Sequence, residues 1–228
     1  MQSRCVSVII PALNEARNIA QTLTQVRQAG ESQLVVVDGD SSDGTPEIAR
    51  SYADLVLSAP RGRARQMNVG ARAATGEVLL FLHADTVLPR GFPGMLAQAL
   101  ADPEVVGGRF DVRLDTPGYL FRVIETLMNL RSRWTRISTG DQAIFVRRET
   151  FLAVGGYPEI DLMEDLALSR KLKQAGNIAC LRARVVTSAR RWQQNGVLRT
   201  VVLMWTLRLA HFLGVPPARL KVFYRDTR

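Results

Sequence analysis

The chain has 228 residues, 46% of them hydrophobic, and a formal net charge of +9 at pH 7. A chain of this length and composition fits one globular domain with a sizeable core and room for a small appendage. The basic balance favours an anionic partner, such as a phosphorylated small molecule or an anionic membrane surface. The sequence has no lysine-rich tail and no signature of a nucleic-acid-binding module, so we expect no nucleic-acid partner.

The sequence also lacks the patterns that target a chain into or across a membrane. Its first residues, MQSRC, enter an apolar stretch without the layout of a signal peptide. The longest apolar run is interrupted by Arg199 and Arg208, and falls short of the roughly 18 uncharged residues that a spanning helix needs. Cys5 and Cys180 have no redox or metal-binding spacing, and both fall in predicted buried strands. We therefore expect a cytoplasmic protein with free thiols, and leave open a peripheral contact with the inner membrane.

The first 90 residues alternate between short apolar runs and helical patterns. The apolar runs cover 6–10, 33–40, 54–59 and 78–82, and the helical patterns between them cover 14–30, 46–53 and 62–76. The runs are continuously apolar rather than alternating, which is typical of strands covered by helices on both faces. The pattern predicts an α/β fold with right-handed crossovers, a mostly parallel central sheet and helices on both of its faces.

Polar and charged residues follow the ends of these predicted strands. In chain order they are Asn14, Glu15, Asp38, Asp40, Asp43, the arginine-rich segment 61–65, His83 and Asp85. The carboxyl ends of parallel strands meet at one edge of a sheet, and open α/β sheets bind their ligands there. We therefore expect these side chains to converge on one site.

The last of these strand ends carries a specific pattern, "LLFLHADTVLP". Side chains alternate along an extended segment, so His83 and Asp85 can point the same way. The pattern leaves two interpretations open, a polar strand end in a solvated turn and a pair of metal ligands.

The second half of the chain is less regular. Its predicted elements are a helix at 92–103, a strand at 105–114, a helix at 119–133, a strand and short helix within 143–157, a helix from 163, short strands at 178–181 and 184–189, and a helix at 196–213. The apolar stripe of helix 119–133 is typical of a core or of an oligomer face. Helix 196–213 is apolar nearly all round between Thr200 and Leu207, which fits burial, pairing with another subunit or contact with a membrane.

Five segments occur in an order and spacing that resemble the family-2 glycosyltransferases. They are "VSVIIPALNEARNI", "VVVDGDSSDGT", "FLHADT", "GGYPEIDLMEDLALSRKLKQAG" and "SARRW". The details "VDGDSSDGT", "GRARQMNVGA" and "LLFLHADT" resemble a small soluble bacterial branch of that family, of the kind named for neighbouring radical-SAM and selenodomain genes. The resemblance covers most of the chain, from Val6 to about Trp192.

The resemblance implies a single nucleotide-sugar-binding domain of the GT-A, Rossmann-like type at 1–192, with a C-terminal helical extension at 193–228 packed on it. It also implies a metal-dependent, inverting transfer of a sugar from a nucleoside-diphosphate sugar, with a UDP-sugar as the expected donor. The acceptor is a small molecule or a lipid, and a homodimer is left open. The alternative is a non-catalytic module that binds nucleotide-sugars or serves as a scaffold at a membrane.

The same resemblance assigns roles to individual residues. Asp165 is the general base, and Asp85 and His83 bind a divalent cation, Mn²⁺ or Mg²⁺. The implied donor-binding residues are Pro11, Leu13, Glu15, Asp38, Arg63, Arg65, Asn68, Ala84, Asp85, Arg191 and Trp192. The implied acceptor-side residues are Gly140, Asp141, Gln142 and Glu164.

The chain departs from the family pattern at four of these segments, one of them at Leu13, where many members have an aromatic residue. Gly39 follows Asp38 where the family has a second aspartate, His83 replaces the first acid of the D-x-D motif, and Ser188 stands where a glutamine is usual. Mg²⁺ prefers oxygen ligands, whereas Mn²⁺ tolerates imidazole, so ligation by His83 would favour Mn²⁺.

Overall fold

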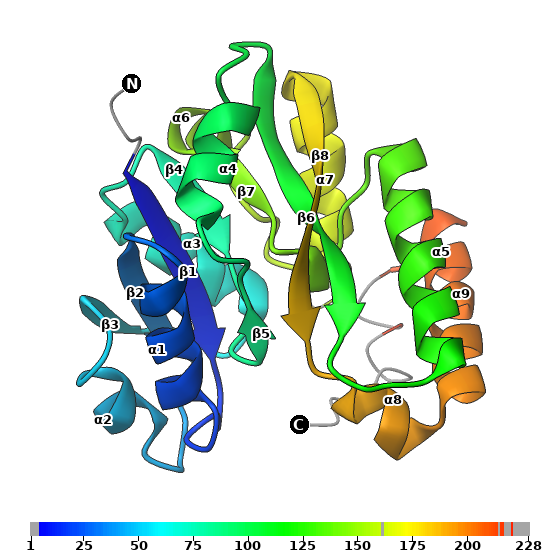
Figure 1. The fold of residues 1–228 in the computed structure, drawn as a ribbon, viewed down its shortest axis with the longest axis horizontal. Helices are drawn as coiled ribbons and strands as arrows, with labels where there is room; N and C mark the ends of the chain where they lie inside the picture. Colours follow the sequence, from blue (N-terminus) through cyan, green and yellow to red (C-terminus); the bar gives the residue numbers. More distant parts are fainter. Residues whose placement is uncertain (1–4, 161, 214, 217–219, 221–228) are drawn as a thin grey trace.

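A mixed sheet of eight strands runs through the part of the chain that the computed structural model describes, residues 5–160, 162–213, 215–216 and 220. The strands are β1 (Val6–Ala12), β2 (Gln33–Asp38), β3 (Leu55–Ser58), β4 (Val78–Phe81), β5 (Thr86–Val87), β6 (Val105–Leu114), β7 (Phe145–Arg147) and β8 (Asn177–Thr187). Their order across the sheet is β3-β2-β1-β4-β7-β6-β8-β5 (Figure 1).

The strand directions divide the sheet into two parts. Strands β1 to β4 are parallel to one another, and β6 is parallel to β8. Strand β7 is antiparallel to both β4 and β6, and the short β5 is antiparallel to β8. The predicted α/β fold with a mostly parallel sheet is confirmed, and each antiparallel pair includes a strand from the less regular second half, β7 or β8.

Helices cover both faces of this sheet. They are α1 (Ile19–Ala29), α2 (Thr45–Ala49), α3 (Arg63–Ala73), α4 (Phe92–Ala99), α5 (Tyr119–Thr135), α6 (Arg148–Ala153), α7 (Glu164–Ala175), α8 (Arg190–Asn195) and α9 (Val197–Phe212), with a 3₁₀ turn η1 at Gly140–Gln142. In Figure 1, α1 and α4 lie in front of the sheet and α3 lies behind it.

Two hydrophobic cores lie on opposite faces of the sheet because successive strand residues point to opposite sides. Val8 and Ile10 of β1 join the core beneath α1 and α4, whereas Ile9 joins the core beneath α3, α6 and α7. All three side chains are fully buried. The continuous apolar runs that predicted these strands therefore reflect two covered faces.

The predicted start of the first helix was wrong by several residues. The helix was expected from Asn14, but α1 begins at Ile19, and Asn14 adopts a left-handed conformation with φ of 55°. The backbone amides of Asn14 and Ala16 instead donate hydrogen bonds to the side chains of Ser41 and Asp43. Side-chain acceptors from a second loop thus replace the first helical turn.

Two further expectations need correction. The short strands expected at 178–181 and 184–189 form one strand, β8, because β6 pairs with it along its length. Cys5 is exposed just before β1 rather than buried in a strand, and Cys180 is half-buried in β8.

Asn68, expected to bind the donor, is a buried residue of α3. It is 7% exposed, accepts the N–H of Tyr157 at 2.9 Å and donates to the carbonyl of Tyr157 at 2.8 Å. The side chain therefore joins α3 to the segment before α7, and its role in the fold is structural.

Replacing this amide should destabilise the protein. Asn68→Ala leaves the buried N–H and C=O of Tyr157 without partners, so we expect the free energy of unfolding to fall by about 2–4 kcal/mol. Urea unfolding measures the change, with Arg72→Ala at an exposed position of the same helix as the control. Equal stability of Asn68→Ala and the control would show that the bridge contributes nothing.

Candidate functional site

A cavity of about 180 Å³ lies where β1, β4, β6 and β8 end. Nine of the residues expected at the site line this cavity. They are Pro11, Glu15, Arg63, His83, Ala84, Asp85, Asp141, Asp165 and Trp192. The convergence of polar residues at the carboxyl edge of the sheet is thus present in the structure for residues that follow β1, β3 and β4.

The segment that carries His83 and Asp85 is the loop between β4 and β5. The amide of Thr86 donates to the carbonyl of His83 at 3.2 Å, and the hydroxyl of Thr22 in α1 donates to the carbonyl of Ala84. Strand β5 then pairs with the end of β8, where Thr86 lies opposite Thr187. This pairing places the loop beside the segment that follows β8.

That neighbouring segment supplies a positive charge to the cavity. Ser188, Arg190 and Trp192 all line it, and the amide of Arg190 donates to the hydroxyl of Ser188 at 3.2 Å. A guanidinium at this position is suited to an anionic ligand. The side chain of Arg191, also expected to bind the donor, lies outside the described residues.

Asp85 lies in an acidic environment. Burial raises the pKa of the Asp85 carboxyl, the neighbouring charges of Glu15 and Asp141 raise it further, and Arg190 opposes them. All four side chains line the cavity. Carboxylates this close favour a bound cation, because a positive charge among them relieves their repulsion.

The residues present fit a cation held jointly with a ligand. Among the described residues, no group of three or more His, Cys, Asp or Glu side chains forms a ready-made metal cage. Mg²⁺ and related ions are commonly bound through one or two carboxylates together with substrate phosphates. Asp85, with His83 on the same loop and cavity, matches that kind of site.

Asp165 lines the same cavity from the first turn of α7. One carboxylate oxygen accepts the N–H of Gly140 at 2.9 Å, and the other accepts the N–H of Leu166 at 2.8 Å. The residue before this helix turn, Met163, adopts a left-handed conformation with φ of 67°. Two backbone amides thus fix the orientation of the carboxylate while it borders the cavity.

Gly140 is important for its backbone and for its small size. A Cβ atom placed on Gly140 would lie 2.6 Å from Nε2 of His83, so any larger residue would displace the imidazole. The residue therefore gives its amide to Asp165 and leaves room for His83. This explains a glycine at a position that was expected only to face the acceptor.

Glu164 does not line this cavity, although it was expected on the acceptor side. Its side chain is 4% exposed and pairs with Nε of Arg63 at 2.8 Å. Burial raises the pKa of Glu164, Arg63 opposes this, and Asp165 adds to it. Glu164 borders a void of about 10 Å³ together with His83 and Asp165, so it supports the cavity from beneath.

Three further residues expected at the site lie outside the cavity lining. Arg65 forms a 3.4 Å ion pair with the exposed Glu159. Gln142 is fully buried, and its side-chain oxygen accepts the amide of Thr139 in a capping box around η1. Leu13 is half-buried and does not border the cavity.

Asp38 also lies outside the cavity lining, at the end of β2. It is 4% exposed, and its Oδ2 accepts the amides of Asp40 and Ser41. Its Oδ1 is buried and has no hydrogen-bond partner among the described residues. An unsatisfied buried carboxylate oxygen is costly, which makes this atom a candidate acceptor for a ligand.

The cavity also contains residues that the sequence analysis missed. Thr200 and Met204 of α9 line it, and Leu162, Met163 and Leu166 around the start of α7 line it as well. The only signal in the sequence was the threonine within the apolar run of helix 196–213. The position of α9 against the segment 162–166 is a tertiary contact that this run does not specify.

The sequence profile described as "Glycosyl transferase family 2" matches residues 7–157. The chain belongs to glycosyl transferase family 2. The matched range contains the His83–Asp85 loop and Asp141 but ends before Asp165, so the base candidate follows the matched segment.

Curated relatives in this family are similar over much of the chain. The glycosyltransferase AglE of Haloferax volcanii is 29% identical over 173 residues, which are 67% of this chain and 56% of that protein. The poly-beta-1,6-N-acetyl-D-glucosamine synthase of Staphylococcus epidermidis is 24% identical over 186 residues, 73% of this chain and 45% of that protein. The chain thus spans about half the length of these curated relatives.

Solved structures show the same fold. S. aureus TarS 1-349 in complex with UDP-GlcNAc has a TM-score of 0.63 and 22% identity, covering 81% of this chain and 58% of that chain. A second TarS structure has a TM-score of 0.64 and 20% identity, covering 81% of this chain and 36% of that one. These likenesses place the family-2 chain among GT-A glycosyltransferase folds.

The buried Glu164 should give the stability of the protein a pH dependence. Because its folded pKa is raised above 4.5, the unfolded state loses this proton first as the pH rises, and the free energy of unfolding falls. The fall begins near pH 4.5, stops above the raised pKa and has a slope of at most about 1.4 kcal/mol per pH unit.

Urea unfolding of the wild type and of Glu164→Gln at a series of pH values isolates this contribution. The difference in stability between the two proteins should fall with rising pH within that window. A difference that is flat or rises with pH would contradict a raised pKa at Glu164.

Proposed function

We propose that this chain transfers a sugar from a nucleoside-diphosphate sugar, with a UDP-sugar as the expected donor, to an acceptor in a cation-dependent, inverting reaction. The observation that carries the proposal is that Asp85 and Asp165 border one cavity, with a cation-binding carboxylate and a candidate base in reach of one substrate. Membership of family 2 supports it, as do the complexes of TarS with UDP and with UDP-GlcNAc.

The donor side of the cavity is suited to a diphosphate. Asp85, with His83 beside it, would hold Mn²⁺ or Mg²⁺, and Arg190 adds a fixed positive charge. When bound, the cation neutralises charge on the leaving diphosphate. Oδ1 of Asp38, at the end of β2, has no hydrogen-bond partner among the described residues and would accept an N–H of the nucleobase. Glu15, which lines the cavity, would contact the ribose.

The acceptor side depends on Asp165. In a single displacement the acceptor hydroxyl attacks the anomeric carbon from the face opposite the diphosphate, which inverts its configuration. Asp165 takes the hydroxyl proton as the new bond forms. The amides of Gly140 and Leu166 hold the carboxylate in one orientation, so its remaining lone pairs are directed without reorganisation.

A second candidate is a module that binds nucleotide-sugars without catalysis. The replacement of the first D-x-D acid by His83 motivates it. The position of Asp165 on the cavity argues against it, because a binding module does not need a base there. Nucleotide release from UDP-sugars in the presence of Mn²⁺ separates the two, since a binding module releases none.

Replacing the base should reduce turnover and spare binding. Asp165→Asn should slow nucleotide release by about 10²–10⁴-fold while the affinity for UDP stays within about twofold of wild type. The matched control is Glu159→Gln, which changes an exposed acid outside the cavity. Turnover of Asp165→Asn equal to that of the control would remove Asp165 from the role of base.

Replacing the cation ligand Asp85 should weaken the cation-dependent part of nucleotide binding. In wild type, Mn²⁺ should tighten UDP binding relative to binding in EDTA, and in Asp85→Asn this gain should shrink by at least about tenfold. Isothermal titration calorimetry measures both affinities for each protein, with Glu159→Gln again as the control. An unchanged gain in Asp85→Asn would mean that the cation binds elsewhere.

A further inference from the structure

Exposed apolar side chains are concentrated at one end of the molecule. Ten large hydrophobic residues are exposed among the described residues, and eight of them lie on α5, on α9 or one residue beyond α9. These eight define the α5–α9 face, namely Tyr119, Leu120, Leu127, Leu130, Trp134, Val202, Trp205 and Leu213. A clustered apolar surface of this kind marks an interaction site.

The apolar stripe of α5 points away from the protein. At about 100° per residue, the five exposed positions of α5 from Tyr119 to Trp134 fall within about 100° of the helix circumference. Of the two alternatives left open for this stripe, a core or an oligomer face, the core does not hold for Leu120 and Leu127, which are exposed. Phe121, Ile124 and Met128 of the same stripe are half-buried. Trp134 is 91% exposed and Tyr119 is 81% exposed.

Polar contacts attach the opposite side of α5 to the sheet. The buried carboxylate of Glu125 accepts the amide of Leu114 in β6. The side chain of Asn129 accepts the amide of Val112 at 2.9 Å and donates to its carbonyl at 3.0 Å. Because polar side chains hold this helix against β6, its outward stripe is not needed to anchor it.

Helix α9 has two sides with different surroundings. Thr200 and Met204 line the cavity, and Leu207 is buried against the segment 162–166. Val202 and Trp205, on the other side of the helix, are 65% and 66% exposed. Helix α9 therefore forms a wall between the candidate site and the α5–α9 face.

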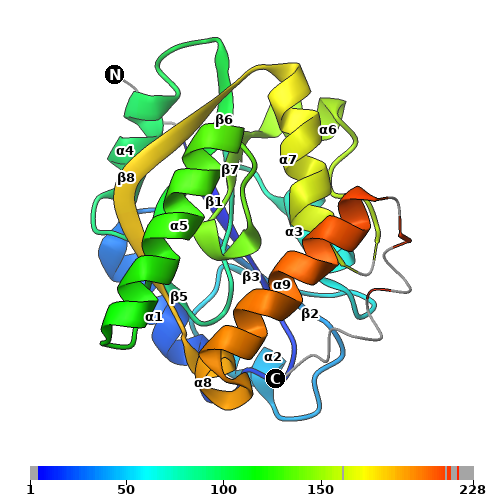
Figure 2. The ribbon, with the colours of Figure 1, turned by 90° about the vertical axis from the view of Figure 1, so that its right-hand side faces the viewer.

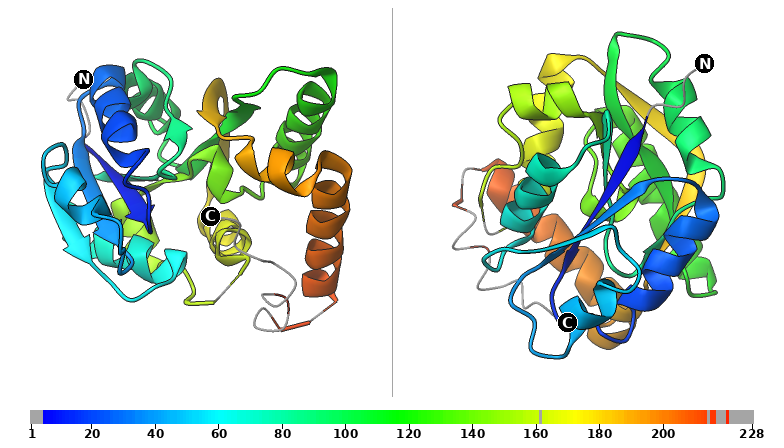
Figure 3. Two further views of the ribbon diagram at one scale, coloured as in Figure 1. Left: turned by 90° about the horizontal axis from the view of Figure 1, so that it is seen from below. Right: turned by 90° about the vertical axis from the view of Figure 1, so that its left-hand side faces the viewer.

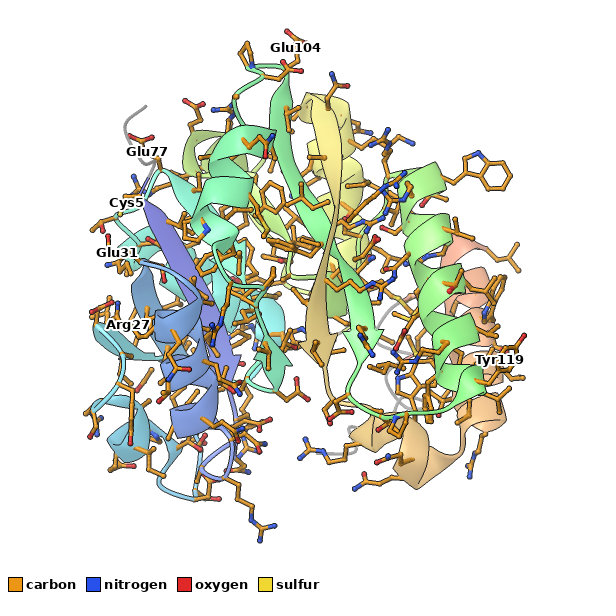
Figure 4. The ribbon with its side chains drawn as sticks, viewed as in Figure 1. Cys5, Arg27, Glu31, Glu77, Glu104 and Tyr119 are labelled. Carbon is orange, nitrogen blue, oxygen red and sulfur yellow. The ribbon has the colours of Figure 1, made fainter. Side chains whose placement is uncertain are left out.

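The two helices lie at the same end of the molecule. In Figure 2 both cross the front of the view, and in the left panel of Figure 3 both lie at the right-hand end. Figure 4 shows the side chain of Tyr119 pointing outward from α5 at that end. The α5–α9 face therefore combines the exposed side chains of both helices.

The positive charge of this face favours an anionic lipid surface over a second copy of the chain. The only acid in α5 is the buried Glu125, and α9 contains none. Arg136 at the end of α5, which donates to the carbonyl of Ile178, and Arg199 in α9 are both exposed. Two copies of a chain with net charge +9 would repel each other across such a face. An anionic lipid surface would instead attract it.

We propose that the α5–α9 face docks on an anionic lipid bilayer, with both helices lying in the interfacial plane. Trp and Tyr are enriched at membrane–water interfaces, and helices with aromatic and leucine side chains on one side and arginines nearby bind there. Neither helix spans the bilayer, since no helix of the described residues is long and apolar enough to cross it. Docking would bring the α9 wall of the cavity to the lipid surface, which favours a lipid among the acceptors left open above.

Co-sedimentation with vesicles tests the docking without any transfer reaction. The purified chain should sediment with vesicles of phosphatidylcholine and phosphatidylglycerol, and raised salt or phosphatidylcholine alone should weaken this binding. The variant Trp134→Ala/Trp205→Ala should bind at least about tenfold more weakly. The matched control Tyr52→Ala/Leu152→Ala changes two exposed hydrophobic residues elsewhere and should bind like wild type.

A second pair of substitutions on the same stripe of α5 tests whether the loss of vesicle binding comes from the face itself. Leu127→Gln/Leu130→Gln, on the same stripe, should lose binding in the same way, and both variants should keep wild-type circular dichroism and UDP affinity. No binding by wild type, or equal binding by the face variants and the control, would overturn the proposal. A third outcome would also overturn it. If wild type does not bind vesicles but forms a dimer in sedimentation equilibrium, and the face variants are monomeric, the face joins two copies of the chain.

Discussion

The candidate site depends on the pairing of a two-residue strand. Strand β5 joins β8 with Thr86 opposite Thr187, and the two threonine hydroxyls are 3.0 Å apart. This contact fixes the loop carrying His83 and Asp85, which lies just before β5, next to the arginine-bearing segment that follows β8. Residues about 100 positions apart in the chain thereby border one cavity, with a carboxylate on one side and a guanidinium on the other.

Charge distribution in and below this cavity follows from that arrangement. Above, Asp85 gathers with Glu15 and Asp141, and their mutual repulsion favours a cation. Below, Glu164 is neutralised by Arg63, and Tyr157 has a pKa raised well above its usual value by burial and by the charges of Asp165 and Glu164. The charge of Glu164 is thus paired within the protein, whereas the acids around Asp85 are left for a ligand that supplies positive charge.

The sequence predicted those features that depend on local pattern or on order along the chain. Continuous apolar runs predicted the parallel strands, and the motif order brought Asp85 and Asp165 to one site. Sequence patterns do not distinguish a polar residue that binds a ligand from one that makes hydrogen bonds within the core. The side chain of Asn68, for example, was expected to bind the donor but bonds to the backbone of Tyr157. Sequence patterns also missed Thr200 and Met204, because the packing of α9 beside the cavity is decided by tertiary contacts.

The most direct test of the account is a crystal structure of the chain with Mn²⁺ and a non-transferable UDP-sugar analogue. The account predicts the cation on Asp85 and the diphosphate, and the anomeric carbon between the diphosphate and the carboxylate of Asp165. A sugar whose anomeric carbon faces away from Asp165, or a cation bound to other residues, would contradict it.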